Sequence, residues 1–200
     1  MQQRILLSFA LGLVLVVAPA CRHTRPGIVC DATSLVPGAT ISCHMPGYDD
    51  RDFLLALPAP PLDSNTRAIL ALHGGGGNKE GFDTLTCPKG DKASPDCFVA
   101  SASRAGYMVV IPDGYPNALG FRSWNHGGDG PGEHCTNACD KRVDDVGYIG
   151  DLLDYVGRLT GANTAKVAVT GFSNGAGMAH RLACDLSERL RAVAAVSGAT

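Results

Sequence analysis

Short, almost wholly apolar runs alternate along the chain with segments whose apolar residues recur at every third or fourth position. The runs predict buried strands, and the recurring spacing predicts amphipathic helices. The clearest helix is predicted over residues 143–159, with Gly161 as its stop, and another over about 174–186. A patch of small residues over 100–105 predicts a further helix. The predicted strands are, in chain order, 52–58, 68–73, 107–112, 166–171 and 192–197.

Apolar strands that alternate with helices are typical of a parallel sheet covered on both faces. We therefore expect an α/β protein with a doubly wound, mostly parallel sheet. Residues 115–142 are rich in Gly, Asn and Asp, and we expect a long surface loop there. The 200 residues are room for one domain, which we place at residues 31–200.

Composition narrows the function classes. Apolar residues make up 45% of the chain and charged residues 18%, which excludes a disordered protein. Lys and Arg number 17 against 19 Asp and Glu, so the net charge is -2. Without a basic surplus to neutralise phosphates, nucleic acid is not expected as a partner.

The N-terminus has the pattern of a secretory signal peptide over residues 1–20. Arg4 supplies the positive charge, residues 5–17 form an uncharged run, and residues 18–20 read Ala-Pro-Ala. An N-terminal membrane anchor is the alternative, but the run is shorter than the roughly 20 residues that span a bilayer. Cys21 follows directly and is a candidate for lipidation, with 21–30 as a linker. We expect a secreted protein or, alternatively, a periplasmic or outer-surface lipoprotein, with membrane contact only through Cys21.

Eight cysteines in an exported chain indicate disulfides. The local pairs are Cys30 with Cys43, Cys87 with Cys97, and Cys135 with Cys139. Cys184 is then either a buried helical thiol or the partner of a cysteine beyond residue 200. A metal site of His134, Cys135 and Cys139 lacks the usual ligand spacing, so no metal is expected.

The candidate chemistry begins with a glycine-flanked serine. Residues 171–175 read Gly-Phe-Ser-Asn-Gly, which matches G-x-S-x-G between a predicted strand and a predicted helix. In that setting the serine sits on a sharp turn, and glycine is needed on both sides because bulk there would collide with the strand or helix. A dinucleotide-binding turn is the rival, but His180 stands where its third glycine belongs. Ser173 is therefore the candidate nucleophile.

A second glycine turn follows the strand at 68–73. Residues 73–78 read His-Gly-Gly-Gly-Gly-Asn, and no Gly-Lys-Ser/Thr follows to make a phosphate-binding loop. Acyl transfer needs backbone N–H groups that meet the negative charge on the carbonyl oxygen. We assign this oxyanion hole to Gly75, with Gly74 or Gly76 as neighbour, and to the amide of Asn174. His73 is expected to hold the shape of this turn rather than act as a base.

Five motifs, taken together, resemble one family. They are Leu-His-Gly-Gly-Gly-Gly-Asn at 72–78, Ile-Pro-Asp-Gly at 111–114, Trp-Asn at 124–125, Val-Asp-Asp-Val-Gly at 143–147, and Thr-Gly-Phe-Ser-Asn-Gly-Ala-Gly-Met at 170–178. In this order they resemble the polyhydroxybutyrate depolymerase and feruloyl esterase group of secreted α/β-hydrolases, also described as LpqC-like esterases. The resemblance covers roughly residues 48–200.

The resemblance implies ester hydrolysis through a Ser-Asp-His triad, on short-chain polyhydroxyalkanoate or on feruloyl and acetyl esters of polysaccharide. By the same analogy Trp124 lines the substrate site; the alternative is an aromatic ring that pins the long loop to the body. Asp144 and Asp145 are expected to position a helix start, where carboxylates suit the helix dipole. Serine chemistry needs no cofactor, and none is expected.

The chain departs from the family after the serine. The triad order is Ser, then Asp or Glu, then His, yet no histidine follows His180. Two helical turns, about 10–11 Å, separate His180 from Ser173, too far for a base. Three explanations stay open: a fragment, a degenerate homologue that binds without turnover, or a second chain that supplies the missing half. The two function classes are therefore a serine esterase and a non-catalytic, lipid-anchored surface protein.

Overall fold

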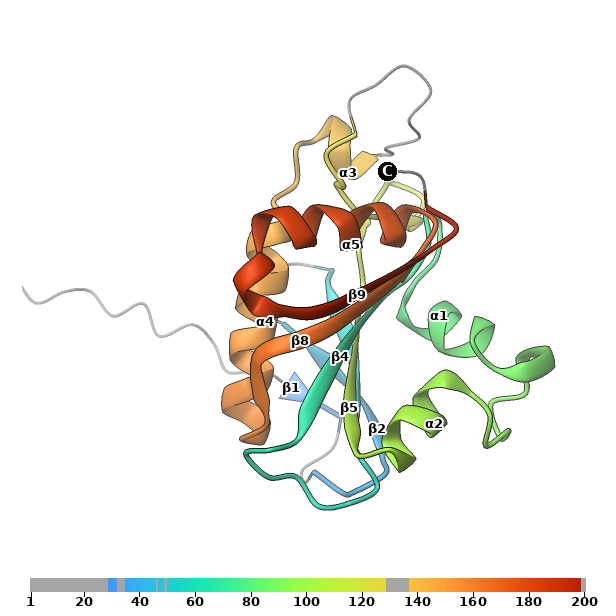
Figure 1. Ribbon diagram of the computed structural model, residues 1–200. Coiled ribbons are helices and arrows are strands. Elements are labelled where there is room, and N and C mark those ends of the chain that lie inside the picture. The colour runs from blue at the N-terminus through green and yellow to red at the C-terminus, as the bar shows by residue number, and fades with distance from the viewer. Residues whose placement is uncertain (1–28, 32–34, 46, 49, 129–136, 199–200) are drawn as a thin grey trace, which may run out of the picture.

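The computed structural model describes residues 29–31, 35–45, 47–48, 50–128 and 137–198 (Figure 1). The expected signal peptide, Cys21, His134 and Cys135 lie outside these residues. The strands are β1 (Val29–Cys30), β2 (Thr40–His44), β3 (Asp52–Ala56), β4 (Arg67–Leu72), β5 (Tyr107–Pro112), β6 (Tyr115–Pro116), β7 (Arg122–Ser123), β8 (Asn163–Phe172) and β9 (Leu190–Val196). The α-helices are α1 (Lys79–Leu85), α2 (Phe98–Arg104), α3 (Asn137–Asp140), α4 (Asp145–Thr160) and α5 (Asn174–Asp185), with short 3-10 helices at η1 (Pro88–Gly90) and η2 (Ser187–Arg189).

One seven-stranded sheet organises the molecule, in the order β1-β2-β3-β5-β4-β8-β9. Strands β5, β4, β8 and β9 run parallel to one another, whereas β1, β2 and β3 join the sheet antiparallel. The carboxyl ends of the parallel strands therefore meet at one edge, where ligand sites of α/β sheets form. The predicted doubly wound, mostly parallel α/β sheet is confirmed.

Helices cover both faces of this sheet, as Figure 1 shows. The larger core packs α4 and α5 on one face, around Leu55, Leu70 and Val169 of the strands. The smaller core packs α1 and α2 on the other face, through Phe82 and Val99. Helices on both faces keep the central strands almost entirely away from water, which explains their continuous apolar runs.

Helix α4 shows how local sequence sets the boundaries of an element. The Asp144 side chain accepts a hydrogen bond from Gly147 N–H at 2.9 Å and caps the helix, which therefore begins at Asp145 rather than at the expected residue 143. Gly161 ends it in the left-handed conformation, with φ of 70°. Asp144 positions the helix start, as expected.

Three segments differ from expectation. Val29 and Cys30, placed in the linker, form edge strand β1. Strand β2 and helix α1 were not predicted. The segment at 115–142 is not only a surface loop, because within its described part β6 and β7 form a hairpin and α3 follows.

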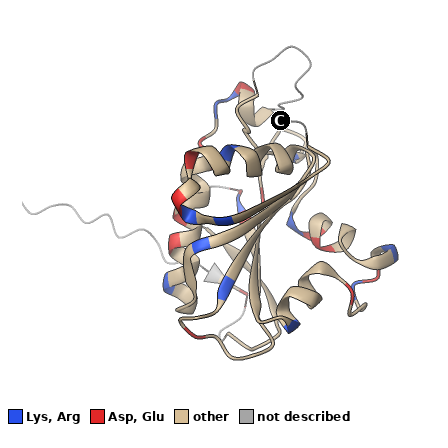
Figure 2. Cartoon of the chain, in the orientation of Figure 1, with Lys and Arg blue, Asp and Glu red and all other residues tan. Residues whose placement is uncertain are grey.

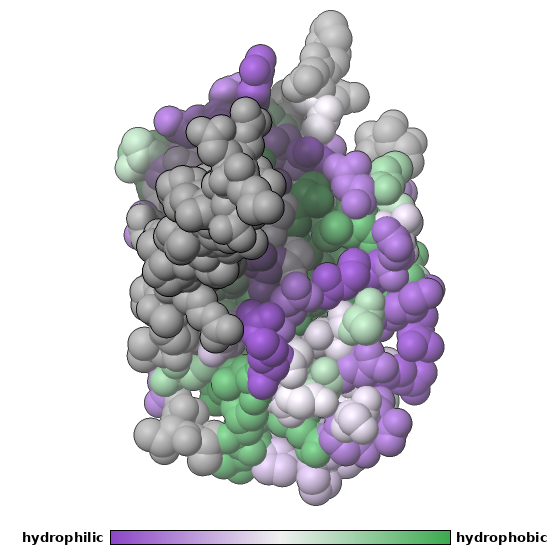
Figure 3. Space-filling model, turned by 90° about the vertical axis from the view of Figure 1, so that its left-hand side faces the viewer, coloured by the Kyte–Doolittle hydropathy of each residue, from purple (hydrophilic) through white to green (hydrophobic). Residues whose placement is uncertain are grey.

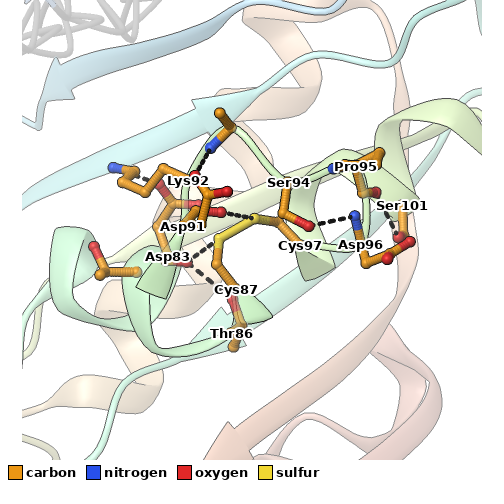
Figure 4. The surroundings of a disulfide bond; sticks show 12 residues. Asp83, Thr86, Cys87, Asp91, Lys92, Ser94, Pro95, Asp96, Cys97 and Ser101 are labelled. Carbon is orange, nitrogen blue, oxygen red and sulfur yellow. Dashed lines mark hydrogen bonds and ion pairs between the residues drawn. A yellow bond between two sulfur atoms is a disulfide. The ribbon is translucent and has the colours of Figure 1, made fainter. Parts of the chain in front are cut away.

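Two of the predicted disulfides are present. Cys30 is bonded to Cys43 directly across the β1–β2 pair, and Cys87 is bonded to Cys97 across the segment that joins α1 to α2. Figure 4 shows the second bond beside Asp83 of α1 and Asp91 of the joining segment. The third predicted pair includes Cys135 and so lies outside the described residues, although Cys139 is itself disulfide-bonded. Cys184 is a free, exposed thiol on α5, so the first of the two alternatives, a buried helical thiol, was wrong.

The described surface carries mixed charge. In the view of Figure 2, Lys and Arg occur together with Asp and Glu over the helices and loops. On the side of the molecule seen in Figure 3, hydrophilic and hydrophobic residues are interspersed. Within the described ranges, no helix has the length and apolar character needed to span a membrane.

Candidate active site

Ser173 lies at a strained turn between β8 and α5. Its φ of 52° and ψ of -118° fall in a region that non-glycine residues rarely adopt. Its N–H donates to Val196 O at 2.9 Å, and its carbonyl oxygen accepts from Ala176 N–H at 2.8 Å. The residue itself is exposed. This geometry suits a nucleophile that must present its hydroxyl at the edge of the sheet.

The two flanking glycines permit this turn by having no side chain. A Cβ on Gly171 would stand 2.1 Å from the carbonyl oxygen of Gly175. A Cβ on Gly175 would stand 2.4 Å from His73 O and 2.5 Å from Leu72 O. Both are backbone atoms that cannot move aside, so the helix can lie this close to β4 only with glycine at these positions.

The polyglycine turn lies beside the serine turn. A Cβ on Gly75 would stand 3.4 Å from Asn174 Cβ, and one on Gly74 would stand 3.0 Å from Phe172 Cδ1. The Gly74 carbonyl accepts from Gly77 N–H at 3.0 Å. Because C=O and N–H of a trans peptide point in opposite directions, this bond turns Gly75 N–H away from the interior of the turn. Among the described residues, neither Gly75 N–H nor Asn174 N–H makes a hydrogen bond.

The prediction that Gly76 contributes to the oxyanion hole was wrong. Its N–H donates to the Arg122 carbonyl of β7 at 2.7 Å, which fixes the turn against the β6–β7 hairpin. A donor already bonded to a backbone carbonyl is not free to bind an oxyanion. The N–H groups that stay available for that role are those of Gly75 and Asn174, with Gly74 adjoining.

His73 holds the turn, as expected, and is buried at 1% exposure. Its Nε2 accepts from Gly114 N–H at 2.9 Å, so the ring proton sits on Nδ1, which donates to Gly74 O at 2.7 Å. Burial lowers the pKa of His73, which favours this neutral form. With both ring nitrogens engaged by backbone, His73 is not placed to act as a base.

The prediction that Trp124 lines the substrate site was also wrong. Its side chain is fully buried, so it does not line a substrate site. The indole Nε1–H donates to His73 O at 2.9 Å, and the main chain of Trp124 bonds the Asn174 side chain. Trp124 therefore pins its loop to the body, which was the alternative reading of this residue.

A buried ion pair supports the same edge of the sheet. Arg51, at the start of β3, donates from Nη2 to Asp145 Oδ1, and both side chains are almost fully buried. The other carboxylate oxygen of Asp145 accepts from Asn125 N–H at 2.6 Å. Burial raises the pKa of Asp145 although the Arg51 guanidinium opposes that shift. Asp145 thus anchors the residue after Trp124, a role its helix-start position did not reveal.

A second buried carboxylate holds helix α1. Asp113 accepts from Lys79 N–H at 2.8 Å and pairs with the Lys79 ammonium at 3.1 Å. Burial would lower the pKa of Lys79, but Glu80 and Asp113 outweigh it and the pKa is raised. Asp113 lies in the Ile-Pro-Asp-Gly motif, but nothing near it in the sequence indicates a bond to Lys79, 34 positions earlier.

No histidine of the described residues is hydrogen-bonded to Ser173. His126 packs its ring on helix α5, where a Cβ on Gly177 would stand 3.0 Å from its Cγ. His180 lies two turns along the same helix. Within the described part of the chain, no three His, Cys, Asp or Glu side chains gather as a metal site.

Several solved structures are similar to this chain, although at low sequence identity. No known family model matches the chain, and no curated protein matches it either. Among solved structures, an acetyl xylan esterase from Aspergillus awamori is similar at 24% identity and a TM-score of 0.52, over 76% of this chain and 48% of its own. Poly(aspartic acid) hydrolase-1 from Sphingomonas sp. KT-1 is 21% identical, with a TM-score of 0.53 over 80% of this chain and 56% of its own. A ferulic acid esterase is 17% identical, with a TM-score of 0.53 over 86% of this chain and 59% of its own.

This chain spans about half the length of these structures. At such identities the likeness concerns the fold, which agrees with the sheet order and the serine turn described above. The chain has the α/β-hydrolase fold in part.

Proposed function

We propose that the chain carries the nucleophile and the oxyanion-binding amides of a secreted serine ester hydrolase. Ser173 Oγ attacks the ester carbonyl carbon, and the N–H groups of Gly75 and Asn174, with Gly74 beside them, bind the oxygen that becomes negative. A base takes the Ser173 hydroxyl proton and passes it to the departing alkoxide, which leaves as the alcohol. Water then hydrolyses the acyl-serine to the free acid and restores the hydroxyl. Among the described residues no base is hydrogen-bonded to Ser173, and the test below supplies one. Preorganised donors of this kind each lower the activation barrier by about 2.7–4 kcal/mol.

One observation carries the proposal: an exposed serine at positive φ, between a parallel strand and a helix, beside a glycine turn. The strain at Ser173 supports a functional role for this side chain, because a glycine at the same position would avoid the strain. The two disulfides agree with secretion.

The substrate class we propose is a carboxylic ester, either short-chain polyhydroxyalkanoate or feruloyl and acetyl esters of polysaccharide. The sequence motifs support both groups, and two of the similar structures are named as an acetyl xylan esterase and a ferulic acid esterase. No cofactor enters this chemistry.

The alternative function is a homologue that binds esters without turning them over, anchored by a lipid at Cys21. The observation in its favour is that no histidine of the described residues is bonded to Ser173. Without a base to take its proton, a serine hydroxyl is a weak nucleophile. Binding and the oxyanion hole alone leave roughly 10³–10⁴-fold catalysis over water.

The test supplies the base from solution. Release of p-nitrophenol from the acetate and butyrate esters is measured against imidazole concentration, for the chain and for Ser173→Ala. Imidazole hydrolyses these esters by itself, so the measured quantity is the difference between the two proteins. We expect little difference without imidazole and at least a tenfold rise with it, together with an acetyl group on Ser173 found by peptide mass spectrometry. Equal rates at every imidazole concentration would leave the binding homologue as the function.

A further inference from the structure

The side chain of Asn174 is bonded to a loop that lies 50 residues earlier in the sequence. Trp124 N–H donates to Asn174 Oδ1 at 2.7 Å, and Asn174 Nδ2 donates to Trp124 O at 3.1 Å. The carboxamide thus satisfies both polar groups of one residue's main chain, as a neighbouring strand would. The residue after the nucleophile is thereby joined to Trp124 by two hydrogen bonds.

Trp124 is in turn bonded to the polyglycine turn. Its indole Nε1–H donates to His73 O at 2.9 Å, and its ring lies against the His73 ring with centroids 5.1 Å apart. His73 O belongs to the peptide that carries Gly74 N–H. Because the two groups of a trans peptide point in opposite directions, the indole fixes the direction of that N–H.

These bonds close a ring of contacts. Gly75 follows at once, and a Cβ there would meet Asn174 Cβ at 3.4 Å. The serine turn therefore contacts the Trp124 loop, the Trp124 loop contacts the glycine turn, and the glycine turn contacts the serine turn. Such a closed path fixes the separation between the N–H groups of Gly75 and Asn174.

We propose that the Asn174 carboxamide is a positioning residue that sets this separation through Trp124. The inference rests on the proposed function in one respect, namely that these two amides receive the oxyanion. It differs from a general stabilising role because it predicts that the Asn174 and Trp124 bonds act in series. Removing either bond then releases the same turn.

The first measurement needs no catalysis. The chain has one tryptophan, so its indole N–H gives a single resonance whose exchange with water can be followed by NMR. In Asn174→Ala we expect this exchange to speed up at least tenfold, with shifted amide resonances for Gly74 and Gly75.

The matched control is Asn117→Ala. The Asn117 side chain, like that of Asn174, makes two hydrogen bonds to the backbone, but it lies in the tip of the β6–β7 hairpin. Its Oδ1 accepts from Leu119 N–H at 2.9 Å and from Phe121 N–H at 3.0 Å. We expect its indole exchange to stay within twofold of the parent chain. Indole exchange in Asn174→Ala that also stays within twofold would overturn the proposal.

The second measurement uses the imidazole-dependent, Ser173-dependent reaction. Trp124→Phe keeps a ring and the main-chain bonds to Asn174 but removes the indole donor. We expect Asn174→Ala and Trp124→Phe each to lower kcat at least tenfold with KM within threefold, and the double variant to lose no more than the larger single loss. Losses that multiply would show that the two bonds act independently and would contradict the proposal. Absence of any Ser173-dependent reaction would count against the proposed function, while indole exchange still decides the positioning role.

Discussion

Gly171 and Gly175 approach so closely that a single methyl group on Gly171 would stand 2.1 Å from the Gly175 carbonyl oxygen. Gly175 in turn faces the carbonyl oxygens at the end of β4. The two glycines therefore allow helix α5 to start directly against the sheet, and the direction of Ser173 depends on that contact.

We expect Gly175→Ala to lower the free energy of unfolding by about 2–3 kcal/mol, because the new methyl group meets backbone that cannot move aside. The matched control is Gly150→Ala in α4, where nothing lies within 4 Å of the new Cβ. That change should stabilise the chain by about 0.5–1 kcal/mol through helix propensity. Urea unfolding of both variants measures the difference, and equal effects would contradict the steric account.

The second prediction concerns the folding stability of the chain at acidic pH. Burial lowers the pKa of His73 in the folded chain, so the unfolded chain binds the proton more tightly. The stability that His73 contributes is therefore present above about pH 6.5 and is lost as the pH falls from there toward the lowered folded-state pKa.

His73→Gln tests this pH dependence because a glutamine can accept from Gly114 N–H without titrating. We expect urea midpoints of this variant to change less between pH 7 and 5 than those of the parent chain. The same slope in both proteins would mean that His73 does not control acid stability.

The third prediction concerns the energetic coupling between Arg51 and Asp145, which form a buried ion pair. Asp145→Asn leaves the buried Arg51 charge without a counter-charge. We expect this change to lower the free energy of unfolding by about 3–5 kcal/mol. Arg51→Met likewise leaves the buried Asp145 carboxylate without its counter-charge. The double variant should lose much less than the sum of the single losses, since no unpaired charge remains. A thermal or urea double-mutant cycle measures this coupling, and additive losses would argue against it.

The fourth prediction concerns the Cys87–Cys97 disulfide, which closes a segment with a sequence separation of 10. Replacing both cysteines by serine should lower the free energy of unfolding by about 2–4 kcal/mol. Cys184→Ser is the control, because that thiol is exposed and unpaired, and it should leave the urea midpoint unchanged. If the double variant unfolds at the parent's midpoint, the bond contributes nothing to stability.

Sequence predicted the elements whose pattern is local. Strands β4 and β5 consist almost wholly of apolar residues, and β8 contains a short apolar run. Helix α4 repeats its apolar residues at helical spacing. Each of these elements was therefore placed within a few residues. The glycines at 171 and 175 were also assigned correctly as a steric requirement, because the reason for them lies within five residues.

The rest depends on contacts between distant residues. Nothing near Trp124 indicates that it reaches His73, 51 positions earlier, and Asn174, 50 positions later. The same holds for Gly76, whose amide is taken by Arg122. A glycine-rich composition at 115–142 predicts a loop equally well whether that loop is free or bonded to the core.

Strand β9 bonds β8 along one side, and no described strand lies along its other side. Six of its seven residues are exposed, including Val193 and Val196. Its free backbone groups are a template on which a further strand can add, whether from the same polypeptide or from a second molecule. The sheet is therefore extensible at the side nearest Ser173, and self-association of the purified chain should rise with its concentration.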